Sequence, residues 1–166
     1  MKYYLLTFFI LISLLAPRDA SAITPTFFVN QEINFGILSL SPGSCLMIAT
    51  SGAITTWQGD LICILPAGVQ NGLYTITANP NKTVQIKVLP NLDNGNGITF
   101  NPRAYITSDS EAKGIINNSD FVEVNSGVSG VITIYLGGEL GVSTMQASGQ
   151  TINFNFEDAI EWNELN

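Results

Sequence analysis

The sequence predicts an all-β protein, an antiparallel β-sandwich or flattened barrel of about nine or ten short strands. Three observations predict this fold class. Apolar and polar residues alternate in many short runs, as they do along a strand with one buried face. These runs are separated by turns rich in Gly, Pro, Asn and Ser. No segment after the first residues has the spacing and the caps of a helix.

The segment 72–90, GLYTITANPNKTVQIKVLP, has the clearest alternation. It predicts two strands, each with one apolar and one polar face, on either side of the turn Asn79-Pro80-Asn81. A two-residue turn would place Ile76 opposite Gln85, an apolar residue opposite a polar one. A three-residue loop or a crossover between two stacked sheets avoids this mismatch. Both of these connections stay open at this point.

The first residues, MKYYLLTFFILISLLAPRDASA, have the pattern of a secretory signal peptide with cleavage after Ala22. The alternative, a membrane anchor, is disfavoured because the apolar run has only 13 residues, whereas about 20 are needed to span a bilayer. We therefore expect a signal peptide at 1–22 and a single β-sandwich domain at 23–166. The mature chain is expected to leave through the Sec pathway for the periplasm, the cell surface or the extracellular medium.

The mature chain is acidic. The leader contains Lys2, Arg18 and Asp19, so of the 6 basic and 13 acidic residues the mature part keeps 4 and 12, a net charge of −8. A chain of this charge is repelled by nucleic-acid phosphates and by anionic lipid surfaces. We expect no nucleic-acid partner and no membrane insertion of the mature chain.

The mature chain begins with an extended segment, 23–35, that has one apolar edge. Phe27, Val29 and Ile33 share one parity along it. Pro25 near its start suits an edge or terminal strand better than a central one. Such a strand either pairs within its own domain or adds to the open edge of a neighbouring copy, and in the second case Phe27, Val29 and Ile33 are the inserted residues. The segment is therefore a candidate donor strand.

Further strands follow in order along the chain. A turn at 41–43 precedes one strand at 45–50, and two short strands lie within 53–65, where Trp57 is expected in the core. The Asn-Gly pairs of 94–97 predict a hairpin turn rather than a calcium loop. The polar stretch 108–120 is expected to be an exposed loop. The later strands are expected at 98–102, 104–107, 121–124, 131–140 and 150–163, with a bulge or a close backbone approach at Gly137-Gly138.

Cys45 and Cys63 are the two cysteines of the chain. An even count in an exported protein favours one disulfide between them. The alternative is a pair of buried free thiols. A metal or redox role is disfavoured, because the spacing does not suit either role and the chain has no His.

The absence of His excludes Ser-His-Asp and Cys-His catalysis as well as His-ligated metal sites. Glycine loops that bind phosphates or dinucleotides are also missing, as is a GxSxG motif. Two carboxylate pairs, Asp109 with Glu111 and Asp158 with Glu161, leave a hydrolase formally open, although solvated charge explains both pairs. We expect no enzyme, no catalytic or metal-binding residues and no cofactor.

Aromatic side chains offer a different activity, because a flat ring stacks on the apolar face of a sugar. Trp57, Tyr105 and Trp162 are the candidates for glycan stacking. Each lies in an expected strand, where packing into the core is the alternative.

Four stretches resemble one bacterial family. They are INFGILSLSPGS, GLYTITANPNKTVQIKVLP, VITIYLGGELGVS and ASGQTINFNFE, and their order along the chain is similar to that of domain of unknown function 4402. The resemblance spans nearly all of the mature chain, while the acidic end EDAIEWNELN and the cysteine pair depart from the family pattern. It implies an exported, immunoglobulin-like or pilin-like sandwich without an assigned activity, similar to subunits of fimbriae built by chaperone and usher systems.

Two functions follow as hypotheses. The first is an exported structural or surface protein, a fimbrial or cell-surface subunit that assembles through β-strand pairing, with other copies of itself and an assembly chaperone or usher as partners. The alternative is a secreted adhesin or carbohydrate-binding module.

Overall fold

The computed structural model describes residues 23–38, 41–59, 63–64, 68–89, 92–93, 97–116, 120–145 and 159–165. In this part of the chain every regular element is a strand, and all strand pairs are antiparallel, so the all-β prediction is confirmed. The predicted signal peptide lies outside the described residues. The strands are β1 (Thr26–Gln31), β2 (Ile37–Leu38), β3 (Gly43–Met47), β4 (Ile54–Gly59), β5 (Cys63–Ile64), β6 (Gly72–Thr77), β7 (Thr83–Val88), β8 (Leu92–Asp93), β9 (Ile98–Thr107), β10 (Ala112–Ile116), β11 (Val122–Asn125), β12 (Val131–Val142) and β13 (Ile160–Glu164).

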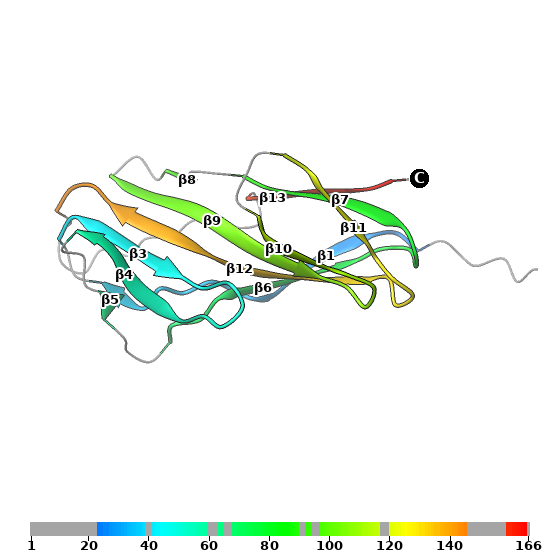
Figure 1. Cartoon of the computed structure of the whole chain (residues 1–166), viewed down its shortest axis with the longest axis horizontal. Coiled ribbons are helices and arrows are strands. Elements are labelled where there is room, and N and C mark those ends of the chain that lie inside the picture. Colours follow the sequence, from blue (N-terminus) through cyan, green and yellow to red (C-terminus); the bar gives the residue numbers. More distant parts are fainter. Residues whose placement is uncertain are drawn as a thin grey trace, which may run out of the picture.

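The largest sheet is organised around β12 and β9, the two longest strands, which run side by side along the molecule (Figure 1). On its other side, β12 pairs with two shorter strands placed end to end. Its first half pairs with β6 and its second half with β3. β1 lies outside β6, and β4 lies outside β3.

A second sheet, in the order β11-β7-β13, packs over the half of the large sheet that contains β6. The main core lies between them and is formed by alternate residues of β6, β7, β9 and β12 with one residue each from β11 and β13. The prediction of a sandwich is therefore confirmed. The fully buried members of the main core include Tyr74, Ile76, Val84, Ile86, Ile106, Ile132 and Ile134.

The two strands of the 72–90 segment belong to different sheets, because β6 pairs in the large sheet and β7 in the small one. The crossover is therefore the correct one of the two predicted connections. Asn81 in the turn has a φ of 57°, a left-handed conformation that Asn tolerates better than most residues.

A second apolar cluster fills the opposite end of the large sheet. Met47, Ile98, Phe100 and Leu140 are buried there, and Ile33 covers them from the segment that follows β1. This covering segment is held in place by a two-way backbone bridge, in which Asn34 donates to Gln70 at 2.8 Å and Gln70 donates to Asn34 at 2.9 Å.

Three expectations are corrected by the structure. Residues 98–102 and 104–107 form one strand, β9, because its register with β12 runs unbroken from Ile98 to Thr107, with Pro102 opposite Gly138. The expected loop 108–120 contains β10, which closes a hairpin with β9. Trp57 is 49% exposed rather than in the core, because β4 lies outermost among the described strands on its side of the sheet and all its residues from Thr55 to Gly59 are exposed.

Gly137 lies where β12 passes from β6 to β3, and it meets the prediction of a close backbone approach. A Cβ atom at this position would lie 2.5 Å from the Met47 carbonyl oxygen and 2.6 Å from the Ala49 nitrogen. Both are backbone atoms, which cannot move aside as the end of a flexible side chain would. The end-to-end arrangement of β6 and β3 therefore requires glycine here.

We predict that Gly137→Ala lowers the free energy of unfolding by about 1–3 kcal/mol, the usual cost of forcing an extra carbon into a packed site. Gly114→Ala on β10 is the matched control, because a Cβ there meets nothing within 4 Å. The control should stay within about 0.5 kcal/mol of the parent. Urea unfolding of the three proteins tests this, and equal midpoints for both variants would contradict it.

Candidate functional site

The candidate assembly strand β1 lies at the edge of the large sheet and pairs with β6 of its own chain. Phe27 faces Ile76, and Val29 faces Tyr74. The ring of Phe27 also stacks on Tyr74, with a centroid distance of 5.7 Å and an interplanar angle of 20°. Both inward side chains are half-buried against the main core. Of the two pairings that the sequence left open, the structure shows the one within the chain.

The other side of β1 faces outward, and Phe28 on this side is 53% exposed. Among the described strands β6 is the sole pairing partner of β1. Within the described strands β1 therefore has the edge position that Pro25 favours. Ile33, the third candidate residue, lies beyond β1 and is 8% exposed in the second apolar cluster.

A polar clamp centred on Asn79 holds the start of the described chain. The Ile23 nitrogen donates to Asn79 Oδ1 at 2.7 Å, and Asn79 Nδ2 donates to the Ile23 carbonyl at 3.1 Å. The same Nδ2 donates to Glu164 Oε1 at 2.8 Å, and the Asn79 backbone nitrogen donates to Glu164 Oε2 at 2.7 Å. Asn79 thus connects the segment before β1 to the end of β13. Sequence reasoning identified the Asn79 turn but not these distant partners.

The three candidate aromatic residues lie apart. Trp57 is on β4, and Trp162 on β13 is packed against the main core. Tyr105 faces away from the core, because its neighbours Ala104 and Ile106 are buried. Its ring lies 6.4 Å from that of Tyr135, at an interplanar angle of 48°. The tilt means that the two rings do not form one flat stacking platform.

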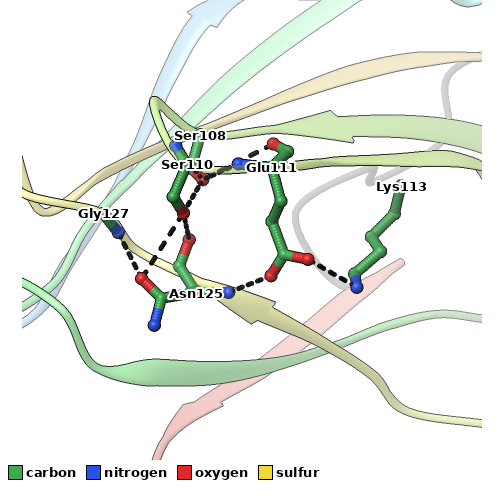
Figure 2. A network of polar contacts seen from close by, with 6 residues as sticks. All are labelled: Ser108, Ser110, Glu111, Lys113, Asn125 and Gly127. Atoms are coloured by element: carbon green, nitrogen blue, oxygen red, sulfur yellow. Dashed lines mark hydrogen bonds and ion pairs between the residues drawn. The ribbon is translucent and has the colours of Figure 1, made fainter.

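The carboxylates of Asp109 and Glu111 hold the β9–β10 turn against the end of β11 and the loop that follows it. Figure 2 shows Glu111 between two partners, an ion pair to Lys113 with an N–O distance of 2.6 Å and a hydrogen bond accepted from the Asn125 backbone nitrogen. Asp109 Oδ2 accepts from the Ser129 backbone nitrogen at 3.0 Å. Two hydrogen bonds lower the pKa of Glu111, the one from Lys113 having the larger effect and the one from the Asn125 backbone nitrogen the smaller. These contacts give both carboxylates a role in stabilising the turn.

Of the second predicted pair, Asp158 lies outside the described residues and Glu161 forms an ion pair with Lys87.

We predict that Glu111→Gln reduces the free energy of unfolding at pH 7 by up to about 1 kcal/mol, since the pair with Lys113 is partly exposed. A lowered folded-state pKa means that the ionised carboxylate stabilises the fold above its ordinary pKa of 4.5, and that this contribution is lost as the pH falls through the lowered value. The loss should therefore shrink in acid. Urea unfolding at a series of pH values measures it.

Glu123→Gln on β11 is the control for this prediction, because Glu123 accepts from the neutral Gln85 side chain at 3.1 Å. A loss of unfolding free energy in Glu111→Gln that is the same at every pH would contradict the lowered pKa of Glu111.

Cys45 is fully buried on β3 and is not a free thiol. Cys63 is on β5, where the structure describes the backbone alone. The predicted pairing of these two residues therefore stays a prediction.

The described residues contain no group of three or more His, Cys, Asp or Glu side chains that could hold a metal ion. They also contain no helix long and apolar enough to cross a membrane.

Comparisons of the chain with protein-family models, curated proteins and solved structures found no match. The family resemblance noted from the sequence stays a prediction, and the site must be interpreted from its own geometry.

Proposed function

We propose that this protein is an exported structural subunit of a fimbria or cell surface, and that it assembles by exchanging β1 between copies. The observation that carries the proposal is the position of β1. It is the first strand of the described chain, it lies at a sheet edge, and its inward side chains help to close the main core.

An edge strand near a chain end can leave its sheet without disturbing the strands on the far side of its neighbour. If β1 of one copy leaves, the β6 edge of that copy is open and Tyr74 loses the stacked ring of Phe27. A β1 strand from another copy restores the same backbone ladder and the same apolar contacts. Exchange therefore needs no new interface, and it propagates head to tail when each copy donates to the next.

The hinge for this exchange lies after Ile33. Ile33 must leave with β1 if it is inserted into the next copy, whereas the Asn34–Gln70 bridge marks the first backbone pairing that stays. Gly36 follows with a φ of 71°, in the left-handed region that favours glycine. Gly36 lies on the side of the bridge that stays, so the change of chain direction falls before it, between Ile33 and Asn34.

The alternative function, a carbohydrate-binding module or adhesin, has less support. Its best residues, Tyr105 and Tyr135, are adjacent but tilted by 48°. Trp162 is packed against the core, and Trp57 stands alone among the three candidates.

We predict that a chain starting at Asn34 is destabilised relative to the chain starting at Ile23, and that a peptide of residues 23–33 added in trans restores it. Unfolding curves with and without the peptide measure this. The proposal is wrong if both chains are equally stable monomers, or if the shortened chain takes up no peptide.

The peptide itself supplies matched controls. Phe27→Asp or Val29→Asp should abolish rescue, because each places a charge against the apolar core. Phe28→Ala should rescue as well as the parent peptide, because Phe28 faces outward. Equal rescue by the three variant peptides would show that the peptide binds nonspecifically.

We also propose that Cys45 and Cys63 form the disulfide, since Cys45 is not a free thiol and Cys63 is the one other cysteine of the chain. Mass spectrometry of the exported protein after alkylation should find both residues blocked. Replacing both by Ser should lower the free energy of unfolding by about 3 kcal/mol on chain-entropy grounds. Alkylation of either thiol without prior reduction would contradict the pairing.

A further inference from the structure

The start of the mature chain, the turn after β6 and the end of β13 meet at one point. Figure 1 shows the chain entering β1 at the end of the molecule where the C-terminus also lies. Asn79 joins them there through the side-chain and backbone hydrogen bonds of the clamp. The Asn79 carbonyl in turn accepts from Ser126 Oγ at 2.7 Å, so the clamp is anchored to the loop between β11 and β12.

The residue held by this clamp is the one that the predicted cleavage makes the first. While the leader is attached, the Ile23 nitrogen is an amide with a single N–H to donate. Cleavage after Ala22 turns it into an α-ammonium group with three donors and a positive charge. The nitrogen that gains this charge already lies 2.7 Å from Asn79 Oδ1.

The carboxylate of Glu164 also contacts Asn79. Glu164 accepts from the side-chain nitrogen and from the backbone nitrogen of Asn79, and both of these donors are neutral. Within the described part of the chain, the two ion pairs are Lys87–Glu161 and Lys113–Glu111, so Glu164 takes part in neither. The ammonium group would supply a cation next to it.

We propose that Asn79 and Glu164 form a receiving site for the α-amino group that cleavage frees at Ile23. Hydrogen bonds to Asn79 and the charge of Glu164 together favour the processed chain end over the unprocessed one. The engaged amine holds the segment before β1 against the turn after β6, and so favours β1 in its sheet. Processing then strengthens the attachment of the strand.

The consequence for assembly rests on the proposed function. If β1 is exchanged, the site on each copy receives the amino terminus of the next copy, and processing of the leader becomes a condition for a fully attached strand. Capture of the amine within one copy does not depend on assembly, and it is tested separately.

The test compares three forms of the mature protein: one that starts at Ile23, one acetylated at that nitrogen, and one with a Gly added before Ile23. Acetylation keeps one N–H and removes the charge, and the added Gly moves the charge by one residue. We expect each change to raise the unfolding equilibrium constant about two- to fivefold, the range for a partly exposed ion pair. Urea unfolding measures it.

The role of Glu164 is tested by repeating the comparison in Glu164→Gln, where the three forms should become equal. Glu161→Gln on the same strand is the matched control, because Glu161 pairs with Lys87 and should leave the differences in place. The inference fails if the three forms are equally stable in the parent, or if the differences persist in Glu164→Gln. It also fails if sequencing of the exported protein finds a first residue other than Ile23.

Discussion

The ladder between β9 and β12 is the interaction on which the rest of this structure depends. Ten residue pairs join the two strands, and the inward residues of both contribute to the two main apolar clusters. Because β12 is longer than its other neighbours, β6 and β3 share its second edge, one after the other. Gly137 makes this possible by letting the backbone of β3 come close. The position of β6, and therefore the edge that receives β1, follows from this arrangement.

The edge position of β1 gives it two opposing properties. Its inward side chains contribute to the main core, so the protein is less stable without them. Yet among the described strands it has one neighbour instead of two, so its removal breaks a single described ladder. Edge strands of this kind are ready templates for pairing with another chain, and proteins that are not meant to associate usually protect them. The clamp around Asn79 holds the segment that leads into β1, at one end of this edge.

Much of the fold could be predicted from the sequence, because β6, β7 and β12 show a clean alternation of apolar and polar residues over six or more positions. The edge position of β1 was also predictable from Pro25. β10 was missed because its five residues, AKGII, do not alternate and lie within a polar stretch, and its pairing with β9 determines its conformation. The exposure of Trp57 follows from the outer position of β4 among the described strands, which the residue pattern does not indicate. The clamp joins residues 56 and 85 positions apart, and a turn motif such as Asn79-Pro80-Asn81 indicates nothing about partners at that separation.

If β1 of one copy pairs with β6 of another, a disulfide cross-link between copies should capture the pair. Phe28 and Thr75 face each other on the outer side of the sheet, close enough for a disulfide once both are cysteines. One copy would carry Phe28→Cys and a differently tagged copy Thr75→Cys, and the two would be mixed under assembly conditions and mild oxidation. Thr133→Cys serves as the register control, because Thr133 pairs with Thr75 on the side away from β1. The account predicts a cross-link for the Phe28–Thr75 combination and not for Phe28–Thr133. No cross-link between copies, or equal cross-linking in both combinations, would contradict it.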